Sequence, residues 1–282
     1  MNRNLQMKIQ GLFRMALPAT LLLVGCSHQP MVPTMTLSGI IVPAYFYPEG
    51  DGLELWAELD TAALQLQNRL TVVANPANGP GAEVDSSYTA VLARLKNAGG
   101  QVLGYVHTCW GATSESEKEG DCWRSEEDVE RDVERWYANY AIDGIFLDEA
   151  STRQEKARYY QRLYDIIQRK QPGAMVVNNF GTVPHADYLK IGGSILCVFE
   201  NRTDFSTWQH RQSWISAGDA NRFLALIYES ASRSNWQTLV RHSRNQNVGW
   251  IYLTDSGAGN PWDRLPSFWD DLVQFVKETS TH

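Results

Sequence analysis

The stretch IDGIFLDE at residues 142–149 decides the fold of this chain. The run from Gly144 to Leu147 carries no charge, so it predicts a strand that is buried on both faces. Asp148 and Glu149 follow at the C-terminal end of that strand, where α/β proteins bind their ligands. Two carboxylates at such a place indicate acid/base or nucleophilic chemistry, although Asp and Glu also begin helices.

The same alternation of apolar strand and amphipathic helix runs through the rest of the chain. It predicts eight strands, at residues 39–46, 70–75, 101–107, 144–148, 174–178, 194–200, 223–228 and 248–254. Helical spacing of apolar residues occurs at 86–98, 126–137, 155–170, 236–245 and 268–277, and a short helix is expected around 185–190. This order predicts an α/β fold with a single (β/α)8 TIM barrel. The rival, an open doubly wound sheet, lacks a glycine-rich dinucleotide fingerprint here.

The N-terminus is typical of a targeting segment and is excluded from the fold. Basic residues precede a short apolar stretch, and Leu23-Val24-Gly25-Cys26 resembles a bacterial lipobox. We expect a lipoprotein signal peptide at 1–25, lipidation of Cys26, a tether at 26–37 and one domain at 38–282. The alternative is an ordinary secretory signal. Ser27 favours the outer membrane in a Gram-negative cell envelope, with the lipid as the chain's only attachment to the membrane.

Net charge, cysteine positions and missing ligand motifs indicate which partners, disulfides and cofactors to expect. Removing the three basic residues of the leader takes the formal net charge from −7 to −10, which argues against nucleic acid. Cys109 and Cys122 form a possible disulfide in an oxidising space, and Cys197 lies in an apolar run as a buried thiol. The sequence has no cysteine and histidine spacing typical of zinc sites, no calcium-binding loop and no phosphate-binding glycine loop, so we expect no metal and no cofactor. We also expect a monomer.

Polar side chains follow every predicted strand at the end where a barrel binds ligands. In chain order the ends provide Tyr45 and Tyr47, Asn75 and Asn78, Tyr105 and His107, Asp148 and Glu149, Asn178 and Asn179, Glu200, Glu229, and Thr254 and Asp255. As substrate-binding candidates we select Tyr45, Tyr47, Asn75, Asn78, Tyr105, His107, Asn178, Glu229 and Tyr252. His107 could equally be a core residue, and Glu229 could merely cap the segment that follows.

Asp148 and Glu200 each end an apolar run that would otherwise be core. If both point inward, two carboxylates face each other across the barrel mouth, as glycoside hydrolysis requires. An ion pair between Glu200 and Arg202 is the alternative. Aromatic side chains that could stack on sugars, or simply pack in the core, are Tyr45, Tyr47, Tyr105, Trp110, Trp208 and Trp250.

These motifs together resemble the spherulin-4 (spherulation-specific family 4) proteins. The resemblance covers roughly residues 38–275 and rests on IVPAY at 41–45, NPANGPG at 75–81, VLGYV at 102–106 and DGIFLDE at 143–149. It implies a (β/α)8 barrel that cleaves α-1,4-linked N-acetylgalactosamine or galactosamine polymers internally. By the same resemblance Asp148 is the nucleophile, Glu200 the acid/base and Glu149 an orienting group. The loop at 109–124 departs from the family pattern and puts the substrate in doubt.

The sequence therefore predicts a cell-surface, retaining endo-glycosidase that acts on a hexosamine-containing exopolysaccharide. Two alternatives stay open: a non-catalytic carbohydrate-binding lipoprotein on a barrel scaffold, and a barrel hydrolase of an unrelated glycan.

Overall fold

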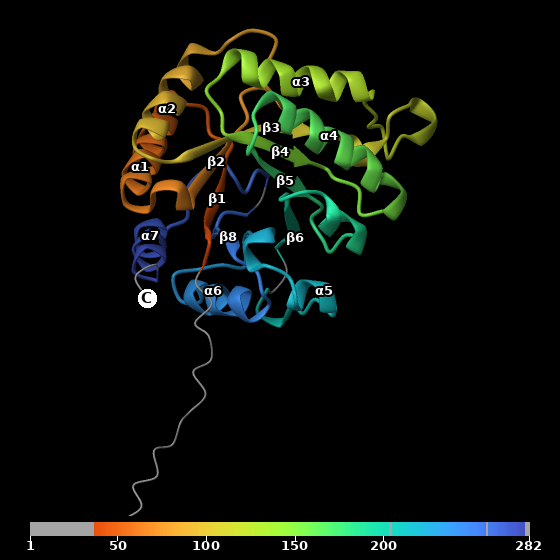
Figure 1. Cartoon of the computed structure of the whole chain (residues 1–282). Coiled ribbons are helices and arrows are strands. Elements are labelled where there is room, and N and C mark those ends of the chain that lie inside the picture. Colours follow the sequence, from red (N-terminus) through yellow and green to blue (C-terminus); the bar gives the residue numbers. More distant parts are fainter. Residues whose placement is uncertain (1–36, 203–204, 258, 280–282) are drawn as a thin grey trace, which may run out of the picture. The chain divides into compact units, whose positions relative to one another are not determined.

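Eight parallel strands close into a barrel in the computed structural model, with each strand bonded to the next and β1 bonded to β8 (Figure 1). The structure describes residues 37–202, 205–257 and 259–279. The strands are β1 Gly39–Ala44, β2 Leu70–Ala74, β3 Gln101–His107, β4 Gly144–Asp148, β5 Met175–Asn179, β6 Ile195–Asn201, β7 Phe223–Ile227 and β8 Trp250–Leu253. The predicted barrel is confirmed, and the open sheet is excluded.

Helices cover the outside of the barrel between successive strands (Figure 1). They are α1 Asp51–Leu66, α2 Ser86–Asn97, α3 Glu126–Asn139, α4 Ala157–Lys170, α5 Ser213–Ser216, α6 Trp236–Asn245 and α7 Trp269–Glu278. Short 3₁₀ turns are η1 Gln67–Arg69, η2 Cys109–Gly111, η3 Glu115–Glu117, η4 Gln154–Lys156, η5 Ala186–Lys190, η6 Phe205–Thr207 and η7 Ala220–Arg222. The short element expected around 185–190 is therefore η5, whereas α1 was missing from the prediction.

Close packing between α3 and β3 fixes the strand that carries Tyr105. A side chain at Gly104 would collide with the indole of Trp136, since a Cβ there would lie 2.4 Å from it. The Trp136 indole nitrogen donates a hydrogen bond to the Tyr105 carbonyl at 2.8 Å. Asp143 similarly ties the start of β4 to β3, because its Oδ2 accepts from the Val102 amide at 2.9 Å. Both contacts hold the two strands that lead into the barrel mouth.

The register decides which residues face the barrel interior. Adjacent Cα partners on parallel strands point to the same side, and side chains alternate along each strand. His107 pairs with Asp148 in β4, and Leu147 pairs with Asn178 in β5. Asp148 and Asn179 therefore share the interior side, while Asn178 shares the helix-facing side with Leu147.

The leader, Cys26 and tether residues 26–36 lie outside the described residues. Leu37, predicted as the last tether residue, is instead buried in the core, and its carbonyl accepts from the Arg69 guanidinium at 2.8 Å. From residue 37 onward the described chain belongs to one compact unit, Met35–His282. Within the residues that the structure describes, no helix is both long and apolar enough to cross a bilayer.

Candidate active site

Asp148 is held by hydrogen bonds to both of its carboxylate oxygens. The Tyr105 hydroxyl donates to Oδ2 at 2.8 Å, and the Asn179 amide donates to Oδ1 at 2.7 Å. The donors come from β3 and β5, the two strands that flank β4. Such paired donors fix the orientation of a carboxylate.

Glu200 reaches the interior because β6 is irregular. Cys197 pairs with Leu224 and Glu200 with Leu226, so three steps along β6 match two steps along β7. The register shifts between Cys197 and Phe199, as in a β-bulge. Without that shift, strict alternation from Cys197 would turn Glu200 toward the helices. Barrel bulges commonly re-aim a side chain in this way.

One amide joins the two carboxylates. Asn179 Nδ2 donates both to Asp148 Oδ1 and to Glu200 Oε2. Burial and, second, the nearby charge of Asp148 raise the pKa of Glu200 to about 7, while the hydrogen bond from Asn179 acts in the opposite direction. A carboxyl group with such a pKa carries a proton at neutral pH in a large part of the molecules, which suits a general acid.

Glu149 lies on the opposite side of Asp148, at the disulfide. Its backbone adopts φ +51°, which is rare for a residue with a side chain and ends the strand abruptly. Its carbonyl accepts from the Trp110 amide at 2.7 Å. Its Oε2 lies 3.8 Å from the Sγ of Cys122, a sulfur that is bonded to Cys109 and has no hydrogen to donate. Burial, then the charge of Asp148, raises the pKa of Glu149.

Neighbouring aromatic and polar groups complete the mouth. The Tyr45 ring packs edge-on against Tyr105 with 5.7 Å between centroids. His107 Nδ1 lies 3.5 Å from the Asn78 amide nitrogen, and burial lowers the pKa of His107 so that it favours the neutral ring. Asn75 acts within the loop, since its Oδ1 accepts from the Gly79 amide at 2.9 Å.

Comparison with known proteins places this barrel. A family model described as spherulation-specific family 4 matches residues 39–276. The chain belongs to this family. Spherulin-4 of Physarum polycephalum is 29% identical over 229 residues, which are 78% of this chain but 64% of that protein. This family member therefore spans less than two thirds of the length of that relative.

Solved structures also resemble this chain. The crystal structure of Sph3 from Aspergillus clavatus, in complex with GalNAc, shares 25% identity at a TM-score of 0.71 and covers 86% of this chain and 98% of its own. A β-D-glucuronidase from Dictyoglomus thermophilum shares 12% identity at a TM-score of 0.51 and covers 88% of this chain and 51% of its own. The second likeness shows the barrel fold alone.

Two substrate-binding predictions need revision in this family member. Asn178 faces the helices with both amide atoms buried and unpartnered, so Asn179 replaces it at the site. Tyr252 is fully buried, and its hydroxyl donates to the Arg264 carbonyl at 3.4 Å, so its ring offers no face to a sugar. Tyr47 stays a prediction, since it is exposed and its hydroxyl donates to Asp85 at 2.9 Å.

Trp208 and Trp250 also lie away from the mouth. Trp250 begins β8, at the N-terminal end of the barrel, and its indole donates to the Asn221 carbonyl at 3.0 Å. Trp208 stacks on Phe205 in the helical layer, with 5.4 Å between centroids. The sequence places Asn179 at the end of the fifth strand. It does not show which of the two neighbouring asparagines faces the barrel interior.

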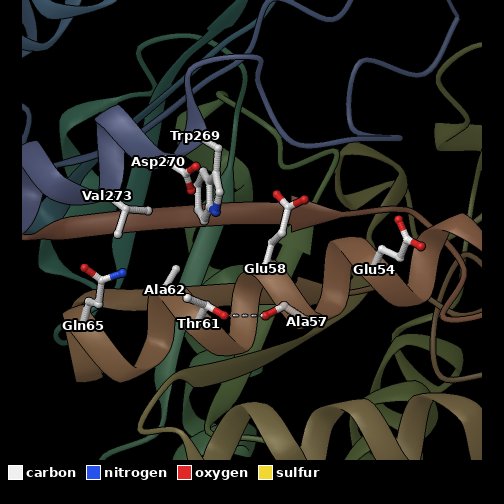
Figure 2. A pocket seen from close by; sticks show the side chains of 9 residues that line it. All are labelled: Glu54, Ala57, Glu58, Thr61, Ala62, Gln65, Trp269, Asp270 and Val273. Carbon is white, nitrogen blue, oxygen red and sulfur yellow. Dashed lines mark hydrogen bonds between the residues drawn. The ribbon is translucent and has the colours of Figure 1, made fainter.

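Two further features near or outside the mouth carry no catalytic chemistry. His107, Cys109 and Cys122 offer ligand atoms within 4.8 Å of one another, but the two sulfurs are joined in a disulfide and provide no thiolate for a metal. A groove of about 330 Å³ has its described lining residues on α1 and α7. Figure 2 shows Trp269 beside Asp270, with Glu54 and Glu58 on α1. This groove lies in the helical layer and not at the strand ends.

Proposed function

We propose that this protein is a glycoside hydrolase whose working groups are Asp148 and Glu200. The carrying observation is that one amide, Asn179, bridges both carboxylates at the C-terminal mouth of the barrel. Two carboxyl groups in such proximity, one of them with a raised pKa, are the machinery of glycosidic bond cleavage.

The separation of the two groups supports a retaining mechanism. Because a single nitrogen contacts both, the two bridged oxygens lie within two hydrogen-bond lengths, under about 6 Å. Retaining enzymes place their carboxyl groups roughly 5–5.5 Å apart, whereas inverting enzymes leave about 6.5–9.5 Å for a water. In this proposal Asp148 attacks the anomeric carbon and Glu200 protonates the departing oxygen. Glu200 then removes a proton from the water that releases the sugar.

A hexosamine polymer is the proposed substrate. The similar protein Sph3 from Aspergillus clavatus was solved with GalNAc, and the negative formal charge of this chain suits a neutral or cationic glycan. We propose internal cleavage of an α-1,4-linked N-acetylgalactosamine or galactosamine exopolysaccharide. Tyr45 and Tyr105 offer ring edges and a hydroxyl at the carboxylate pair, and Glu149 would orient the sugar.

The proposed location is the bacterial cell envelope. A lipid on Cys26 would hold the domain at the membrane. In a Gram-negative cell the proposed membrane is the outer one, and the proposed oligomeric state is a monomer. Radiolabelled fatty acid incorporation, lost in Cys26→Ala, tests this anchor. A full-length Cys26→Ala chain that still carries lipid would refute it.

Reducing-end release tests the activity. Protein beginning at Ser27 is incubated with N-acetylated and partly deacetylated α-1,4-galactosaminan. Asp148→Asn and Glu200→Gln should each lower the rate by about 10³-fold or more, because nucleophile and acid are lost in turn. Glu134→Gln, on the outer face of α3 and paired with Lys170, is the matched control and should retain full activity.

The outcomes separate the alternatives. Near-wild-type activity in either site variant would remove that residue from the mechanism. Cleavage of other glycans alone would move the enzyme to a different substrate. Tight glycan binding without new reducing ends, by folded wild-type protein, would favour a carbohydrate-binding lipoprotein.

A further inference from the structure

A cavity of about 320 Å³ opens beside the carboxylate pair, at the ends of β6, β7 and β8. The described residues that matter for its chemistry are Glu200, Arg202, Tyr228, Glu229 and Trp262. Glu200 is the only member of the carboxylate pair among its described lining residues, since Asp148 lies toward β3 and β5. The cavity therefore continues the mouth on the far side of Glu200.

The position of the cavity next to Glu200 indicates which sugar of the substrate it would bind. In retaining glycosidic cleavage the nucleophile approaches the anomeric carbon of one sugar from the face opposite the bond that breaks, and the acid contacts the oxygen that links this sugar to the next. A sugar over Asp148 and Tyr105 would therefore be the one that is attacked. We propose that the cavity beyond Glu200 binds the leaving hexopyranose unit, with Trp262, Arg202 and Glu229 as its contacts. This inference rests on the proposed function and adds the binding direction of the chain.

The aromatic wall of the cavity is fixed to the catalytic groups. The Trp262 carbonyl accepts from the Tyr45 amide at 3.1 Å, and Tyr45 packs against Tyr105. The rings of Trp262 and Tyr228 meet edge-on, with 5.5 Å between centroids. A wall held in this way keeps a constant distance from Glu200, as a subsite next to a reacting bond requires.

Polar groups stand at the rim of the same cavity. Arg202 and Glu229 face each other with 3.9 Å between nitrogen and oxygen, and their side chains are 70% and 48% exposed. Glu229 adopts φ +63°, the second glutamate after a strand in the left-handed region. Backbone outliers of this kind cluster at binding sites. Gly257 leaves the room for the Glu229 side chain, since a Cβ there would lie 3.2 Å from Glu229 Cγ.

A pair of substrates tests the assignment, with the full chain solubilised in detergent. The first is a hexasaccharide of α-1,4-linked N-acetylgalactosamine, and the second is the trisaccharide α-fluoride, in which fluoride replaces the leaving sugar. Arg202→Ala and Trp262→Phe should lower kcat/KM for the hexasaccharide by about tenfold more than for the fluoride. Asn78→Ala, on the opposite rim beside His107, is the matched control and should lower both values equally.

Each result decides the matter. Equal losses on both substrates in Arg202→Ala and Trp262→Phe, or no loss in either, would overturn the leaving-group subsite while the glycosidase proposal stands. Wild-type protein that releases neither fluoride nor reducing ends would overturn the proposed function and the subsite with it. Melting temperatures near the wild-type value show that each variant is folded.

Discussion

Glu200→Gln should make the protein more stable at pH 8 but not at acidic pH. Glutamine keeps the size of the side chain and an oxygen that can accept from Asn179, so the change removes the ionisable proton and little else. The prediction concerns the free energy of unfolding and holds whatever the substrate is.

The sign follows from the pKa of the folded state. Burial and Asp148 raise the pKa of Glu200 from 4.5 to about 7. Below the unfolded pKa both states hold the proton, and the carboxyl group costs nothing. As the pH rises, the unfolded state releases its proton first, so the folded state loses stability until the pH passes the folded pKa. Glutamine cannot ionise and therefore escapes this loss.

The magnitude follows from the same shift. One pKa unit corresponds to about 1.4 kcal/mol, so the full shift corresponds to about 3 kcal/mol above pH 7. Part of the Glu200 side chain still reaches solvent, which makes this value a ceiling. We expect the gain of Glu200→Gln over wild type to grow by about 2 kcal/mol between pH 5 and pH 8.

Urea unfolding followed by tryptophan fluorescence measures this gain. Glu229→Gln is the control, because its half-exposed side chain at the same rim predicts a change within about 0.5 kcal/mol at both pH values. In an Asp148→Asn background the gain should shrink but persist, because burial is the larger cause. A gain that is independent of pH, or largest at pH 5, would refute the buried, Asp148-coupled state of Glu200.

Further predictions concern three other features. Tyr105→Phe removes a donor to Asp148 and should lower kcat by about tenfold with the fold intact by circular dichroism; an unchanged kcat would contradict its orienting role. Asn178→Leu should raise the free energy of urea unfolding by about 1 kcal/mol, because it removes a buried amide without partners; a loss of stability would indicate a hidden partner. Replacing Cys109 and Cys122 by serine should lower that free energy by about 3 kcal/mol, and equal stability with and without the disulfide would contradict its structural role.

The strands were predictable because each is a short, predominantly apolar run, with charge confined to the C-terminal part of β4 and β6. All eight predicted strands match the structure to within two residues at each end. The helix α1 escaped prediction although Trp56, Leu59 and Ala63 form a buried stripe along it. Leu53 and Leu64 are 43% and 66% exposed on its other faces and blur the helical period.

The site was predictable only where position along the strand decides it. Asp148 could be found because it ends an apolar run, and the end of a parallel strand is a ligand-binding place in barrels. The choice between Asn178 and Asn179 depends instead on which face each side chain takes. In a strand buried on both faces the apolar pattern carries no such signal, so a shift of one residue cannot be detected. The register of β5 with β4 shows that Asn179 faces the interior and Asn178 faces the helices.

Glu200 lies near Asp148, as the sequence predicts, but the sequence does not show why its side chain points there. The sequence shows only that a carboxylate follows an apolar run, and strict alternation from Cys197 would have turned that carboxylate outward. The register shift before Phe199 brings it back to face Asp148. Glu149 and Glu229 leave ideal strand geometry too, through left-handed backbone at the ends of β4 and β7. The three glutamates at this mouth are therefore aimed by local irregularities, which hydrophobic periodicity does not encode and which tertiary packing must hold in place.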